Sequence, residues 1–299
     1  MMITLENIMI NIFVEVDDFY KTIIPSMDEY IAEYNHNNNG KRVYRIRKDT
    51  LSESEIITIL ILYQLSSCKN LKKFYMEYNG ILKTYFPKLP CYNRFLMLER
   101  KTTHLLPSFI SHLFGEETGI YYIDSTPLVV CRNQRIHKHK TFRDLAERGK
   151  SSMGWFYGFK LHLIINNNKG ELMNFKLTKG NVFDNRVIED LVKYNRKESK
   201  LFGDKGYICK KEVNNKLRDK YNMELITKSR RNMKHRQYDT LSEENKRFLR
   251  KRNLVKTVIG EIKRLTNITT TKIKNVFNYF VNIFSSILTY QLKIRMKLG

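Results

Sequence analysis

Hydrophobic and polar residues follow two different patterns along the chain, and the change lies near residue 119. Before it, apolar residues recur at helical spacing. Ser52 and Glu55 form a capping-box pattern directly before the apolar run Ile56–Leu62, so we expect a helix to start there. Two further helices are predicted over Leu71–Tyr78 and Tyr92–Leu106, separated by Asn-Gly and proline-containing turns. The first hundred residues are therefore predicted to be helical.

From Gly119 onward the pattern is typical of strands joined by turns. Aromatic and β-branched residues predict a central strand over Ile120–Ile123, which runs into Asp124. Trp155–Ile165 and Glu171–Thr178 flank a turn and predict a hairpin. The later elements are expected to alternate between helix and strand, over Arg186–Tyr194, Leu201–Gly203, Lys210–Lys220 and Glu224–Thr227, with a packing helix over Val276–Leu292. This order predicts an α/β layer architecture.

The charge of the chain indicates a polyanionic partner. Lysine and arginine number 54 against 30 acidic residues, which gives a net charge of +24 and a pI near 9.8. Such a balance favours nucleic acid first and an anionic membrane surface second. The longest apolar run, Ile56–Leu65, is too short to span a bilayer, so we expect a soluble protein. The four cysteines have no CxxC spacing, which argues against a zinc knuckle or a disulfide framework.

Clusters of basic residues are candidate contacts to phosphate. One follows the central strand, and a second lies near residue 230. The segment Lys41–Lys48 is a further candidate arm. The alternative for any such run is a solvated surface. The predicted DNA-binding residues are Arg132, Arg135, Lys138, Lys140, Arg230, Arg231, Lys234 and Arg236.

Two aspartates each follow the apolar residues of a predicted strand. Asp124 comes after Ile123, and Asp204 comes after Gly203. If the two strands are neighbours, the carboxylates converge and repel each other unless a cation lies between them. Mg²⁺ fits this role, because it binds a few carboxylates together with waters and phosphates. The alternative is that Asp124 merely ends its strand and caps a turn at Ser125-Thr126-Pro127.

Several ordered motifs carry a family resemblance: YYIDSTPL, RIHKHKTF, GWFYGFKLHL, LTKGNVFD and LFGDKGY, with LSESEIITILILYQLS and PCYNRF nearer the start. Together they resemble the DDE-type transposases of bacterial insertion sequences, specifically the 982 group. The resemblance implies an RNase H-like mixed sheet flanked by helices, behind an all-helical N-terminal domain. It also implies cutting and joining of transposon-end DNA with Mg²⁺ or Mn²⁺. The expected domains are 1–115 for DNA binding, 116–270 for catalysis and 271–299 for the packing helix.

The resemblance also implies roles for individual residues. Asp124 and Asp204 match the first two metal-binding carboxylates, and they are the first two catalytic candidates. Further positions are expected to line the site, with ordinary sheet and loop polarity as the alternative: Lys160, His162, Asp184 and Lys205. The implied partner is double-stranded DNA, as terminal inverted repeats and target DNA, bound by a homodimer. No membrane is involved, and the expected location is the bacterial cytoplasm, at the nucleoid.

The third carboxylate is where the chain departs from the family pattern. A glutamate is expected on the last catalytic helix, and the matching position is Lys256. Glu261 is the alternative third catalytic residue. Five residues of helix rotate a side chain by about 140° and move it by about 7.5 Å, so Glu261 faces away from the site in this register. Val255, Ile259 and Ile262 are expected to form the buried stripe of that helix.

A lysine at position 256 removes an anionic ligand and adds a positive charge where a metal ion should bind. We therefore expect weak metal binding and slow or absent strand transfer. Two alternatives to an active transposase stay open. One is a catalytically silent DNA-binding remnant of the same fold. The other is a basic RNA- or ribosome-associated protein.

Overall fold

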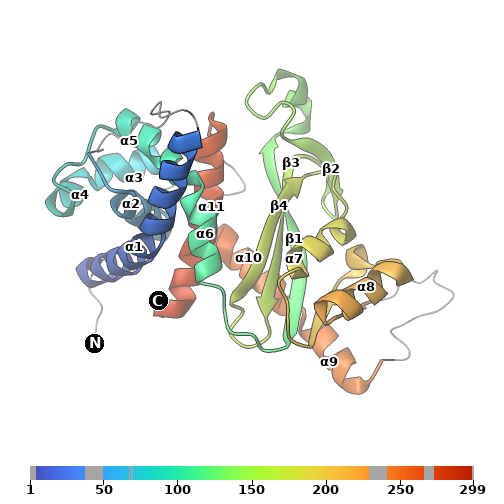
Figure 1. The fold of residues 1–299 in the computed structure, drawn as a ribbon. Coiled ribbons are helices and arrows are strands. Elements are labelled where there is room, and N and C mark those ends of the chain that lie inside the picture. Colours follow the sequence, from blue (N-terminus) through green and yellow to red (C-terminus); the bar gives the residue numbers. More distant parts are fainter. Residues whose placement is uncertain are drawn as a thin grey trace. The chain divides into compact units, whose positions relative to one another are not determined.

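The computed structural model describes residues 5–37, 50–66, 68, 70–228, 241–265 and 273–297. The candidate arm at 41–48 lies outside them, as do Arg230, Arg231, Lys234 and Arg236. The chain divides into two compact units (Figure 1). The first comprises Met1–His112 with Phe277–Gly299, and the second comprises Leu113–Val276. The three-part division inferred from the sequence stays a prediction.

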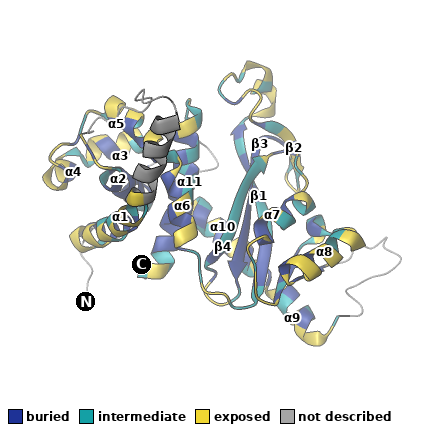
Figure 2. Cartoon of the chain, viewed as in Figure 1, coloured by how far each residue is buried: buried dark blue, intermediate teal, exposed yellow. Residues whose placement is uncertain are grey.

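The first unit is built from helices alone in its described part. Its elements are α1 (Leu5–Asn37), α2 (Glu53–Leu65), α3 (Leu71–Glu77), α4 (Asn79–Tyr85), α5 (Tyr92–Glu99), η1 (Arg100–Thr103), α6 (Leu105–His112) and α11 (Val276–Met296). The helix start predicted at Ser52 is confirmed, because the Ser52 hydroxyl accepts the Glu55 N–H and the Glu55 carboxylate accepts the Ser52 N–H. Most of α2 and α11 is buried (Figure 2). The helical N-terminal region is thus confirmed.

Two helix boundaries predicted for this unit are wrong. The helix expected over Tyr92–Leu106 is interrupted by the 3₁₀ turn η1, and the chain then continues through Pro107 in α6. Pro107 is tolerated because it lies in the first turn of α6, where a backbone N–H has no partner within the helix. Asn79-Gly80, expected as a break, begins α4 instead.

The second unit contains a mixed sheet with the strand order β2-β3-β1-β5-β6, and β4 pairs with β3 beside β2. Strand β3 is antiparallel to its three neighbours, whereas β5 is parallel to β1 and β6. The strands are β1 (Ile120–Cys131), β2 (Glu147–Ser151), β3 (Gly154–Asn166), β4 (Leu172–Lys179), β5 (Ser199–Gly203) and β6 (Met223–Thr227). The predicted hairpin of β3 and β4 is confirmed.

Helices flank this sheet, as predicted (Figure 1). They are the short η3 (Asp184–Val187) and α7 (Ile188–Val192), η4 (Lys205–Tyr207), α8 (Lys211–Tyr221), α9 (Glu243–Lys251) and α10 (Asn253–Leu265). One apolar core joins β1, β5, α7 and α8, and includes Ile123, Leu201, Ile188 and Leu217, all fully buried. The mixed α/β architecture is therefore confirmed. Among the described residues, no helix combines the length and hydrophobicity that crossing a bilayer requires.

Strand β1 is longer than expected. It pairs with β5 only as far as Tyr122↔Phe202, but it continues alongside β3 to Cys131. The turn considered at Ser125-Thr126-Pro127 is therefore wrong. Pro127 is accommodated because none of the described strands pairs with the β5 side of β1 at this level, and an edge strand needs no N–H there. Strand β2 was not predicted, because it lies within a basic segment without strand-like alternation.

Candidate active site

Asp124 and Asp204 are placed by the parallel pairing of β1 and β5. The last paired residues are Tyr122 and Phe202, and the two aspartates each follow two residues later. In a parallel ladder, equal offsets from a pair keep two residues at the same level and on the same face. The expectation that the two strands are neighbours is thus confirmed. Unlike Asp204, which follows the end of β5, Asp124 lies within its strand.

The Asp124 carboxylate is only 14% exposed and is surrounded by charge. Its Oδ1 accepts the Ser125 N–H at 2.9 Å, and Arg252 Nη1 lies 3.4 Å from Oδ2. Burial raises the pKa of Asp124, and the negative charge of Asp204 acts in the same direction. The Ser125 N–H and the charges of Arg252 and Lys256 partly offset this rise in pKa. A cation therefore belongs beside this carboxylate if it is to stay ionised.

Asp204 caps the short helix η4, where its Oδ1 accepts the Gly206 N–H at 2.8 Å. Gly206 has no side chain, and a Cβ there would lie 3.0 Å from both Asp204 Oδ1 and Asp184 Oδ2. These two oxygens are therefore at most twice that distance apart. The absence of a side chain at Gly206 is what allows two carboxylates to face the same turn.

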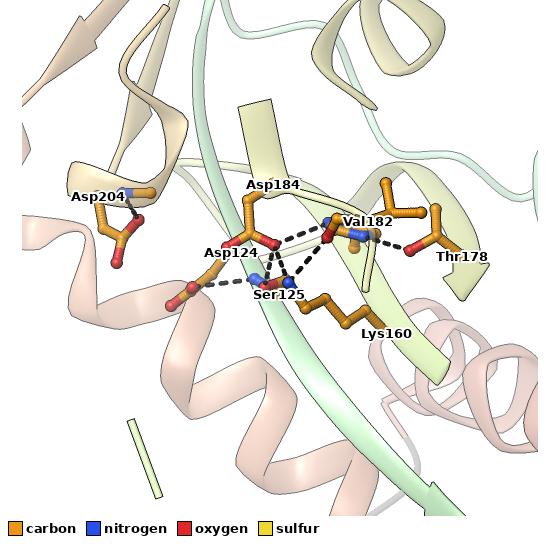
Figure 3. Close-up of polar contacts among 9 residues, drawn as sticks. Asp124, Ser125, Lys160, Thr178, Val182, Asp184 and Asp204 are labelled. Carbon is orange, nitrogen blue, oxygen red and sulfur yellow. Dashed lines mark hydrogen bonds and ion pairs between the residues drawn. The ribbon is translucent and has the colours of Figure 1, made fainter. Parts of the chain in front are cut away.

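The carboxylate of Asp184, at the start of η3, contacts a lysine and a serine side chain (Figure 3). Lys160 Nζ from β3 lies 3.1 Å from Asp184 Oδ1 and also donates to the Val182 carbonyl at 2.9 Å. The Ser125 hydroxyl donates to the same Asp184 oxygen at 3.1 Å. The structure thus brings Asp184 into contact with Ser125, the residue next to Asp124, and brings Lys160 into contact with Asp184. Asp184 is tied to the site through Ser125.

His162 lies behind this network and is fully buried. Its Nε2 is 2.9 Å from the Thr178 hydroxyl, and its Nδ1 is 3.9 Å from Asp184 Oδ1. Burial lowers the pKa of His162 to about 4, and the charge of Asp184 only partly opposes that shift. At neutral pH the imidazole is therefore uncharged. Its position suits holding β3 and β4 together better than contacting DNA.

Helix α10 carries Lys256 at the position where the resemblance implies a carboxylate. The stripe predicted to be buried is confirmed: Val255, Ile259 and Ile262 are buried, together with Val258. Lys256 is exposed, and its charge acts on Asp124. The Glu261 carboxylate instead accepts two hydrogen bonds from Arg264, at 2.9 and 2.7 Å. Glu261 as a third ligand stays a prediction.

Two residues that contact the site were not singled out from the sequence. Arg252 forms the ion pair with Asp124, and Ser125 links Asp124 to Asp184. The signal for Arg252 was available, because it precedes Lys256 by four residues and so shares its side of the helical segment. No sequence pattern indicates the role of Ser125, because the sequence Ser125-Thr126-Pro127 is also typical of a turn.

The predicted DNA-binding residues that the structure describes are all on the surface. They follow β1 on η2 (Asn133–Lys138) and its flanks, and Arg132, Arg135, Lys138 and Lys140 are exposed. Lys205 is also exposed, on η4 beside Asp204. The charges of Arg132, Arg135, Lys138 and Lys140 are available to phosphate.

The carboxylates present fit a divalent ion only in part. In the part of the chain that the structure describes, no three His, Cys, Asp or Glu side chains gather as a metal site. Mg²⁺ is commonly held by one or two carboxylates when substrate phosphates and waters supply the other ligands. Asp124 and Asp204 supply two carboxylates at one level of adjacent strands. The charges of Arg252 and Lys256 oppose it.

The chain is similar to known transposases. A family model described as a transposase DDE domain matches residues 114–276. The fold is similar to that in a cryo-EM structure of a piggyBac transposase synaptic complex with hairpin DNA, with a TM-score of 0.54 and 9% sequence identity; the similarity covers 89% of this chain and 71% of that one. No curated protein matches the sequence. Because the family model spans more than half of the sequence, the chain belongs to the transposase DDE domain family.

Proposed function

We propose that this chain acts on DNA as the transposase of an insertion sequence, cleaving transposon ends and joining them to target DNA. The observation that carries the proposal is the placement of Asp124 and Asp204 at one level of adjacent parallel strands within a DDE domain. The net charge of +24 supports double-stranded DNA as the partner. A homodimer that pairs two terminal inverted repeats is part of the proposal.

In this proposal, Asp124 and Asp204 hold Mg²⁺ or Mn²⁺ on an RNase H-like scaffold. When bound, such an ion activates the attacking oxygen and stabilises the leaving oxygen of a phosphodiester. In this proposal, Arg252 competes with the metal ion for Asp124, because its guanidinium lies 3.4 Å from that carboxylate. Ser125, the neighbour of Asp124 in β1, keeps Asp124 in position because its hydroxyl is bound to Asp184. Asp184 is held in turn by Lys160.

Lys256 is proposed to impair this chemistry. It takes the place of an acidic ligand, and its charge acts on Asp124. Two like charges about 4 Å apart repel by roughly 4 kcal/mol at an effective dielectric constant near 20, and solvent at an exposed lysine reduces that value. We therefore propose that the natural chain binds metal weakly and cleaves slowly or not at all.

A cleavage assay on element-end DNA in Mg²⁺ tests both statements. The natural chain is compared with Lys256→Glu and with Lys251→Glu, which makes the same charge change on an exposed residue of α9. We expect nicking and strand transfer to appear, or to rise strongly, only in the Lys256→Glu protein. Full activity of the natural chain would contradict the proposed impairment. No activity in any variant would argue against the catalytic assignment.

A silent DNA-binding remnant is the second candidate. The ion pair between Arg252 and Asp124 favours it, because a guanidinium already occupies one side of the carboxylate. A mobility shift of element-end DNA without nicking, unchanged by Lys256→Glu, would select this candidate. Membership of a transposase family removes the main support for an RNA- or ribosome-associated protein.

A further inference from the structure

The hairpin of β2 and β3 exposes an aromatic side chain at its end. Lys150 pairs with Trp155 and Ser151 pairs with Gly154, so the strands turn at residues 152 and 153. Met153 is 94% exposed and Trp155 is 56% exposed. Trp155 is also the single tryptophan of the chain. Exposing a large aromatic group and a methionine to water is unfavourable in free energy, and a binding partner that covers them would remove this unfavourable term.

Two cations lie against the indole ring. Arg148 Cζ is 5.4 Å from the ring centroid of Trp155, and Lys150 Nζ is 5.8 Å from it. The Asn133 amide donates to the Trp155 carbonyl at 2.8 Å and fixes the backbone at this point. Cation–π contacts alone are a sufficient reason for the cations to be there. They leave more than half of the Trp155 surface uncovered, however.

The neighbouring position on the same face shows what a covered aromatic residue is like here. Tyr157 lies two residues further along β3, so its side chain is on the face that Trp155 occupies. Tyr157 is buried, its hydroxyl donates to the Phe142 carbonyl, and its ring contacts His139. The segment after η2 therefore covers this face as far as Tyr157 and stops short of Trp155.

The surroundings of Trp155 are strongly basic. Between residues 132 and 150 there are seven lysine and arginine residues against two acidic ones. All seven are exposed: Arg132, Arg135, Lys138, Lys140, Arg143, Arg148 and Lys150. η2 follows the end of β1 at Cys131, which pairs with Tyr157 near the start of β3, so η2 and the end of the β2–β3 hairpin lie at the same end of the sheet. Charge complementarity thus selects a polyanion, and an aromatic group among cations is a stacking site for a nucleic-acid base.

We infer that Arg148, Lys150 and Trp155 form a platform for an unpaired base of DNA. Trp155 stacks on the base, and Arg148 and Lys150 contact the flanking phosphates. The inference rests on the proposed function, because it takes DNA as the substrate. Trp155 lies eight residues along β3 from Leu163, the partner of Asp124. Eight residues of strand span about 26 Å. That length corresponds to about eight base pairs of duplex, so the platform would contact DNA well away from the cleaved bond.

The single tryptophan allows a direct test on the full chain. Trp155 emission is recorded while the protein is titrated with labelled element-end duplex, fully paired or carrying a single-stranded overhang. Anisotropy of the label reports binding independently of Trp155. We expect both DNAs to raise the anisotropy, and the overhang DNA to quench the Trp155 emission much more strongly than the paired duplex.

Variants separate stacking from general binding. Trp155→Ala is expected to weaken binding of the overhang DNA by about 5- to 150-fold, whereas Trp155→Phe keeps most of the affinity. The matched control is Tyr194→Ala, because Tyr194 is 70% exposed and also has a lysine, Lys193, over its ring. We expect this control to leave affinity unchanged.

Binding of both DNAs with no quenching, and equal affinities for Trp155→Ala and Tyr194→Ala, would overturn the platform and leave the proposed function intact. Equal quenching by both DNAs would overturn the preference for an unpaired base. No rise in anisotropy with any DNA would overturn the proposed function and the platform together.

Discussion

Each unit contains a carboxyl group with little solvent exposure, and the two groups differ in their neighbours. Glu99 of the helical unit is 3% exposed, and Asp124 of the sheet unit is 14% exposed at its side chain. Burial raises the pKa of both, in the case of Glu99 to about 8. The Glu99 carboxyl accepts a short hydrogen bond from the Asn278 amide, whose oxygen accepts the Arg100 Nε–H at 2.7 Å.

Asp124 has different neighbours. It faces a second carboxylate, Asp204, and two cations, Arg252 and Lys256. The contrast teaches that burial by itself favours a neutral carboxyl group, whereas a buried carboxyl group stays charged only with compensating positive charge close by. Glu99 is stabilised as part of a packed core. Asp124 lies instead among charged side chains.

The largest expected effect tests the role of Asp124 and Asp204 directly. In the Lys256→Glu protein, either Asp124→Asn or Asp204→Asn should lower the nicking rate of element-end DNA roughly a thousandfold. Several kcal/mol of transition-state stabilisation would be lost with the metal ion, and each 1.36 kcal/mol is a factor of ten. DNA affinity, measured by anisotropy, should change little. A variant that nicks at the unchanged rate would show that the replaced aspartate is not needed for cleavage.

The next effect separates the charge of Lys256 from the missing ligand. Lys256→Met removes the positive charge near Asp124 without adding a carboxylate. We expect cleavage to rise about tenfold above the natural chain and to stay below Lys256→Glu, because screening at an exposed lysine limits its repulsion of the metal. The Mg²⁺ concentration at half-maximal rate is the measurement. If Met and Glu variants behave alike, the missing ligand is irrelevant and charge alone decides.

Glu99 predicts a pH dependence of stability in the helical unit. Between the ordinary value of 4.5 and about 8, folded Glu99 holds a proton that the unfolded chain has released. The unfolded state binds fewer protons there, so the free energy of unfolding falls as pH rises through this window. Glu99→Gln should remove the fall and raise the urea midpoint at pH 8.

The control for this experiment is Glu77→Gln on α3, an exposed glutamate of the same unit. It should leave the pH dependence as it is. A natural chain whose urea midpoint stays constant from pH 5 to pH 8 would show that Glu99 is not the buried acid described above.

The smallest expected effect concerns Glu261. Because Arg264 already holds its carboxylate, Glu261→Gln should change the nicking rate of the Lys256→Glu protein by less than about twofold. The same change in the natural chain should also be silent. A drop comparable to that of Asp124→Asn would instead identify Glu261 as the third ligand and shift the register assigned to α10.

Much of the local structure could be predicted from the sequence. Interactions between residues close in the sequence determine three features that were predicted: the Ser52–Glu55 capping box, the β3–β4 hairpin and the buried stripe of α10. Such patterns can be recognised in the sequence alone. The sequence predicts that strand β1 ends at Asp124, because a carboxylate and a proline argue against a strand. Only pairing with β3, from Asp124↔Leu163 to Cys131↔Tyr157, explains why the strand continues.

The sequence by itself determined the kinds of elements, the excess of positive charge and the two aspartates that end apolar runs. Tertiary structure alone decided that β1 lies beside β5, that Arg252 pairs with Asp124, and that Trp155 stays uncovered while Tyr157 is buried. The physical reason is the range of the interactions. Propensity and periodicity act over a few residues, whereas strand neighbours, ion pairs and burial depend on which distant segments pack together.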